Sequence, residues 1–96
     1  MLRSRRLGVV LAVEERREHA ALEKMARARQ LLDQQLQRLQ ELQQYQADYR
    51  DQMRKSQQGV VSITRLQGWQ AFITQLDQVI GQQGAQVKRA EGQFEE

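Results

Sequence analysis

The sequence has no cysteine, no proline and few aromatic residues. The absence of cysteine excludes disulfides, thiolate metal sites and a cysteine nucleophile, and nothing points to an oxidising compartment. The absence of proline removes the residue that most strongly interrupts helices. With 40% hydrophobic and only 5% aromatic residues in a 96-residue chain, there is little material for a globular core, so we expect one long, thin helical domain over residues 1–96.

Long hydrophobic runs are also missing. The apolar segment 7–13 follows three arginines and thus imitates the start of a signal peptide, but the charged residues 14–17 follow it at once and no small-residue cleavage site appears. The segment is also far shorter than the ~20 residues that span a bilayer. We therefore expect a cytoplasmic protein without a membrane anchor of its own.

Charge is unevenly distributed along the chain. Residues 1–29 hold eight Lys/Arg and four Asp/Glu, a balance of +4, and the remaining residues sum to −1, which together give the net charge of +3. A basic end attracts nucleic acid, anionic lipid or an acidic protein surface. A solvated helix face with mixed charges is the simpler alternative.

One segment, residues 56–62, interrupts an otherwise helical pattern. Gly59 permits a turn, and Ser62 is a good N-cap, although Arg65 stands where an acid would complete a capping box. We expect helices over about 4–57 and 62–95 with a loop at about 58–61. Because so short a loop cannot connect parallel helices of this length, the pattern predicts an all-α, antiparallel two-helix coiled-coil hairpin.

Heptad spacing supports the hairpin on both sides of the loop. Three glutamines at seam positions either set the register or soften the packing, and the glycines at 68, 81, 84 and 92 weaken the second helix. The predicted seam consists of Ala21, Met25, Ala28, Leu32, Gln35, Leu39, Leu42, Gln46, Tyr49 and Met53, facing Leu66, Trp69, Ile73, Leu76, Ile80, Gln83, Val87, Ala90 and Phe94.

The helices predicted on the two sides of the loop differ in length. Residues before about 22 have no partner within the chain, so Leu7, Val10, Leu11 and Val13 should form an exposed apolar overhang. A contact site, an oligomer interface and a chain shorter than its natural length all explain such an overhang.

Nothing in the sequence indicates catalysis. A two-helix rod has no concave pocket, and we expect neither enzyme activity nor a cofactor. His19 has Glu15 and Glu23 one helical turn away on either side, but it lacks the second histidine of a zincin helix. Solvated neighbours at i,i+4 are the better explanation, so we predict no metal site.

Apolar residues also flank the seam, where the core does not need them. In the antiparallel register Tyr45 should lie beside Phe72, and Arg38 beside Val79, next to Leu42, Tyr49 and Leu76 of the seam. In a bundle of two helices such flanking residues stay substantially exposed. We interpret the strip as a partner-binding surface, whereas the simpler alternative is a broadened core stripe.

These residues resemble the family of the flagellar export protein FliJ. The resemblance rests on segment 39–50, which contains Tyr45-x-x-x-Tyr49-Arg50, then on Gly59 and Leu66, then on segment 69–83, and segment 14–21 is similar as well. It implies a non-catalytic coiled coil, similar to the stalk of rotary ATPases, in the flagellar type III export apparatus. Such a protein lies in the cytoplasm, peripheral to the inner membrane on its cytoplasmic face.

The resemblance also implies partners: the hexameric export ATPase (FliI-like), the export gate protein (FlhA-like) and export chaperones, but no nucleic acid. Carried over by position, the gate-contacting residues are Leu42, Tyr45, Tyr49, Phe72, Leu76 and Val79, and the ATPase end includes Leu7, Leu11, Arg5 and Arg6.

Arg38 and Gln83 depart from the residues expected at these positions. Family members are usually longer, so we expect a truncated chain or a divergent short form. The alternatives are the stalk protein of a virulence-type secretion system, a self-associating coiled coil and a nucleic-acid-binding coiled coil.

Overall fold

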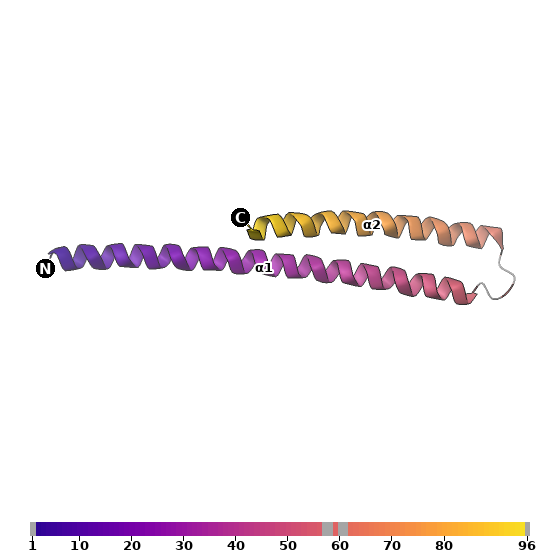
Figure 1. The fold of residues 1–96 in the computed structure, drawn as a ribbon, viewed down its shortest axis with the longest axis horizontal. Coiled ribbons are helices and arrows are strands. Elements are labelled where there is room, and N and C mark those ends of the chain that lie inside the picture. Colours follow the sequence, from indigo (N-terminus) through magenta and orange to yellow (C-terminus); the bar gives the residue numbers. More distant parts are fainter. Residues whose placement is uncertain (1, 57–58, 60–61, 96) are drawn as a thin grey trace.

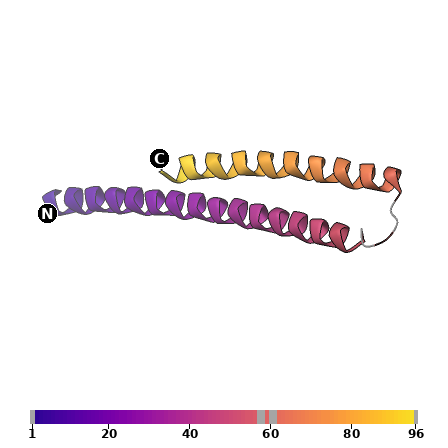
Figure 2. The same ribbon diagram turned by 45° about the vertical axis from the view of Figure 1, so that its right-hand side comes forward.

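A computed structural model of the protein describes residues 2–56, 59 and 62–95, which form two helices, α1 (Leu2–Ser56) and α2 (Ile63–Glu95). The helices lie side by side in opposite directions, and the N-terminal part of α1 projects beyond the end of α2 (Figure 1 and Figure 2). The molecule measures 90 × 17 × 14 Å, and its radius of gyration is 25.0 Å, compared with about 13 Å for a compact domain of this length. The predicted all-α hairpin is confirmed.

Helix α1 ends at Ser56, whose hydroxyl donates to the carbonyl oxygen of Gln52 at 2.9 Å. Arg54 and Lys55 occupy the last turn, where positive charge complements the helix dipole. Gln57 and loop positions 58, 60 and 61 lie outside the described residues. Gly59 lies in a bend.

Ser62 caps the N-terminus of α2 as predicted. Its Oγ accepts the N–H of Arg65 at 3.2 Å, and its carbonyl oxygen accepts the N–H of Leu66 at 3.1 Å. These bonds satisfy donors that would otherwise lack a partner in the first helical turn. The side chain of Arg65, which replaces the acid of a capping box, lies over the Trp69 ring, with 5.2 Å from guanidinium carbon to ring centroid.

Burial follows the predicted heptad positions closely. Among the residues whose burial the structure describes, five are buried, and all of them occupy predicted seam positions: Leu32, Leu76, Gln83, Val87 and Ala90. The other seam positions from Ala28 to Met53 and from Leu66 to Phe94 are half-buried. The most tightly packed part is the cluster of Leu32, Val87 and Ala90, against which Leu36, Leu39 and Phe94 pack.

The seam begins at Ala28 rather than at the predicted Ala21 and Met25. Met25 is 55% exposed, although its position is opposite Phe94. Side chains on a helix lean toward that helix's own N-terminus. In an antiparallel pair Met25 therefore leans away from the end of α2, whereas Phe94 leans inward onto the Leu32–Val87–Ala90 cluster.

The three seam glutamines take part in side-chain hydrogen bonds that join the helices. The buried Gln83 amide donates to both the carbonyl oxygen and the Oε1 atom of Gln35, at 2.9 and 2.7 Å. Nearer the loop, the amide of Gln46 donates to the carboxylate of Asp77. Sliding one helix along the other would break all three bonds and leave Gln83 buried without partners. Of the two roles considered for these glutamines, the contacts favour register control.

Candidate functional site

An aromatic cluster joins the two helices on one edge of the hairpin. The Tyr45 and Phe72 rings are 6.3 Å apart between centroids at 76°, an edge-to-face pair, and the Tyr49 and Phe72 rings are 4.6 Å apart at 55°. The prediction that Tyr45 lies beside Phe72 is confirmed. Such ring pairs hold the flanking side chains in defined positions. We call the predicted set around this cluster the distal strip: Leu42, Tyr45, Tyr49, Phe72, Leu76 and Val79.

Members of the distal strip differ in how accessible they are. Tyr45 is 52% exposed, whereas Leu76 is only 7% exposed and belongs to the seam. Leu42, Tyr49, Phe72 and Val79 are half-buried. Tyr45 is therefore the most accessible side chain of the distal strip, and Leu76 is the least accessible.

The opposite edge of the same segment is polar. There Asp77 accepts the Gln46 amide and lies 3.7 Å from Nη2 of Arg50. Both contacts join the two helices, so hydrogen-bonded and charged groups occupy this edge. The two edges of this segment thus differ in chemistry, and the Tyr45 and Phe72 rings lie on the edge opposite Asp77 and Arg50.

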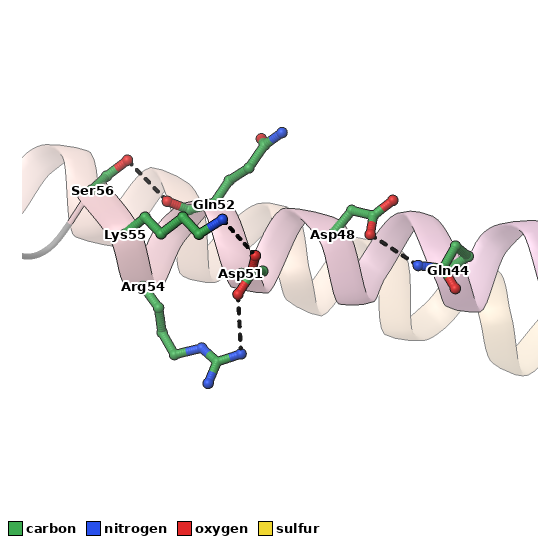
Figure 3. A network of polar contacts seen from close by, with 7 residues as sticks. All are labelled: Gln44, Asp48, Asp51, Gln52, Arg54, Lys55 and Ser56. Carbon is green, nitrogen blue, oxygen red and sulfur yellow. Dashed lines mark hydrogen bonds and ion pairs between the residues drawn. The ribbon is translucent and has the colours of Figure 1, made fainter.

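The outer face of α1 near the loop is polar as well (Figure 3). The Gln44 amide donates to Asp48 at 2.9 Å, and Asp51 pairs with Arg54 at 3.5 Å and with Lys55 at 3.2 Å. Exposed pairs of this kind contribute little to stability. The distal strip therefore ends where this face of α1 begins, because the side chains named here are polar.

A groove between the helices lies next to the distal strip, on the side away from the loop. Arg38 and Val79 both line it, as the predicted register requires. Its complete lining is Gln35, Arg38, Val79, Gln82, Gln83 and Gln86. The sequence pattern placed Arg38 here but assigned it no function.

The N-terminal overhang carries the second predicted contact region. Leu7 is 63% exposed, Val10 54%, Leu11 53% and Val13 39%, which confirms that this region is uncovered. Arg5 and Arg6, which directly precede Leu7, are exposed as well. All seven residues of segment 7–13 are non-polar, so every side of α1 is apolar over about two turns.

His19 pairs with Glu23 through Nε2 and Oε1 at 3.0 Å, and both side chains are well exposed. Over residues 2–56, 59 and 62–95, no three side chains of His, Cys, Asp or Glu are arranged to hold a metal ion. Within the same residues, neither helix is long and apolar enough to cross a membrane.

A thin helical hairpin with an aromatic strip on one edge defines the class of two-helix coiled-coil proteins. Comparison with known families gives the particular family. The model of the family described as flagellar FliJ protein matches residues 3–96, so the chain belongs to the FliJ family, a non-catalytic component of the flagellar export apparatus. The resemblance noted in the sequence is thereby confirmed. No curated protein and no solved structure matches the chain.

Proposed function

We propose that this protein is a cytoplasmic coupling rod of the flagellar type III export apparatus. It binds the hexameric export ATPase (FliI-like) with its terminal end and the export gate protein (FlhA-like) with the distal strip, and it helps to escort export chaperones. In this role it lies on the cytoplasmic face of the inner membrane. Membership of the FliJ family supports the proposal.

The observation that carries the gate assignment is the Tyr45–Phe72–Tyr49 cluster. Its rings come from both helices, so only the folded hairpin presents the complete surface. Tyrosine is enriched among residues that dominate binding energy, since it offers a large rigid ring and a polar end. Tyr45, half exposed and braced by Phe72, has the properties of such an anchor.

The overhang supports the ATPase assignment. A helix that is apolar on every side is usually buried on every side, and one neighbouring helix would cover a single face of segment 7–13. A ring-shaped partner that encloses the rod would cover all of them. Arg5 and Arg6, at the entrance to this segment, would meet acidic groups of such a partner.

The test is a reciprocal binding experiment with two double variants. Tyr45→Ala/Phe72→Ala should abolish capture of the export gate protein in a pull-down and leave capture of the ATPase intact. Leu7→Ser/Leu11→Ser should do the reverse, because it changes only exposed residues of the overhang. Circular dichroism should show that both variants stay helical.

Ile63→Ala serves as the control, since Ile63 is an exposed aliphatic residue (75%) outside both regions. It should bind both partners normally. Gate binding that survives Tyr45→Ala/Phe72→Ala would refute the assignment of the distal strip.

A further inference from the structure

Every acidic residue between positions 33 and 77 already has a side-chain partner. Asp33 pairs with Arg29 at 3.1 Å, and Asp77 with Arg50 at 3.7 Å. Glu41 accepts the Gln37 amide at 3.2 Å. The remaining two, Asp48 and Asp51, make the contacts on the outer face of α1 described above (Figure 3).

The cations of this stretch are also engaged, with one exception. Arg50, Arg54 and Lys55 have carboxylate partners, and Arg65 lies over Trp69. Among the described residues, Arg38 forms no ion pair, no hydrogen bond and no stacking contact. The nearest acid along the helix, Glu41, is held by Gln37 instead. Arg38 is therefore an exposed cation whose five donors are available.

Arg38 lies directly next to the distal strip. It lines the groove with Val79, a member of the distal strip, while the other lining residues are glutamines and none is acidic. On its other side it shares a surface hollow with Leu42, also of the strip, and with Glu41, whose carboxylate accepts the Gln37 amide. The Gln82 and Gln86 amides add neutral donors and acceptors at the same place. The apolar strip therefore ends in a positive, hydrogen-bonding site.

We propose that Arg38 makes the distal strip selective for an acidic partner segment, one that packs an apolar side chain against Tyr45 and Phe72 and places a carboxylate on the Arg38 guanidinium. This inference rests on the proposed role of the distal strip as a docking surface. Guanidinium binds carboxylate in a bidentate geometry that fixes orientation as well as charge. Because Arg38 is exposed, its effect is chiefly on which partners bind and on how salt weakens them.

The test selects binding peptides without assuming the identity of the partner. A random peptide library on phage is selected against the full-length chain and, in parallel, against Arg38→Gln, Arg89→Gln and Tyr45→Ala. Arg89→Gln is the matched control, because Arg89 is exposed, forms no ion pair within the described residues and lies outside the groove. It removes the same charge at a different place.

The unmodified chain should enrich peptides with Asp or Glu beside an aromatic or aliphatic residue. Arg38→Gln should lose the acidic preference and keep the apolar one, Tyr45→Ala should weaken the apolar one, and Arg89→Gln should keep both. A selected acidic peptide should bind Arg38→Gln about fivefold more weakly, the effect of one exposed ion pair. An equal loss with Arg89→Gln, or acidic enrichment that survives Arg38→Gln, would overturn the proposal.

Failure of this inference is distinguishable from failure of the proposed function. If the gate pull-down depends on Tyr45 and Phe72 but the acidic preference does not depend on Arg38, the function stands and the inference falls. If Arg38-dependent selection is found but the gate does not bind, the strip serves another acidic partner and the gate assignment falls. If Tyr45→Ala does not change which peptides are selected, and Tyr45→Ala/Phe72→Ala does not reduce capture of the gate protein, both the inference and the proposed function are contradicted.

Discussion

The N-terminal part of α1 and the part paired with α2 belong to one continuous helix but have different surroundings. Leu11 in the overhang and Leu32 in the paired part occupy equivalent heptad positions and have the same side chain, yet Leu11 is 53% exposed and Leu32 only 6%. Helix formation depends on local properties that both parts share. Burial depends on whether α2 reaches the position. The comparison therefore separates residues that hold the hairpin together from residues that stay exposed.

The largest difference between the two parts should appear when leucines are truncated. Leu32→Ala should lower the free energy of unfolding by about 2–3 kcal/mol, the lower end for buried leucines because the core is thin. Leu11→Ala should change it by less than about 0.5 kcal/mol. Urea unfolding followed by circular dichroism measures both. An equal loss in the two variants would mean that the overhang is packed in solution, as in a self-associated form, and sedimentation would then show a mass above that of a monomer.

A smaller effect should come from the polar layer of the seam. Gln83→Ala removes two hydrogen bonds to Gln35 from a buried site and should cost about 1–2 kcal/mol. The neighbouring Gln82 is exposed, so Gln82→Ala is the matched control and should have almost no effect. The same unfolding measurement applies. If both variants are neutral, Gln83 softens the seam instead of setting its register.

The smallest effect should come from glycines. Nothing lies within 4 Å of a Cβ placed on Gly81 or Gly8, so neither glycine is required for space. Gly81→Ala should stabilise the hairpin by about 1 kcal/mol through helix propensity. Gly8→Ala should raise helical content in the overhang without moving the unfolding midpoint of the hairpin. A drop in stability with Gly81→Ala would show that another molecule packs against α2 at this position.

Much of the fold was predictable from short-range patterns. Heptad spacing predicted the seam positions that are buried, and Ser62 accepts the cap hydrogen bond predicted for it. The antiparallel register also predicted that Tyr45 lies beside Phe72, and the structure confirms it. These features follow from residue spacing, which a regular helix converts directly into geometry.

Other features depended on how individual side chains lean and pair. Met25 was predicted in the seam but is exposed, because its side chain leans past the end of α2. Leu36 packs against the central cluster from a flanking position that heptad spacing did not single out. The sequence did not show which side chain pairs with each acidic residue, because several cations lie within reach of each acid in the hairpin. It therefore did not show that Arg38 has no ion-pair partner among the described residues.

The sequence by itself determined two long helices, their antiparallel pairing, an apolar end and membership of the FliJ family, because helix propensity, heptad spacing and motif order are all properties of the linear chain. Only the tertiary structure decided where the seam begins, how Gln46 and Arg50 pair with Asp77 on the opposite edge, and that Arg38 has no ion-pair partner among the described residues. Those features arise from contacts between two helices, where side-chain direction and competition among neighbours select one arrangement from several that the sequence allows.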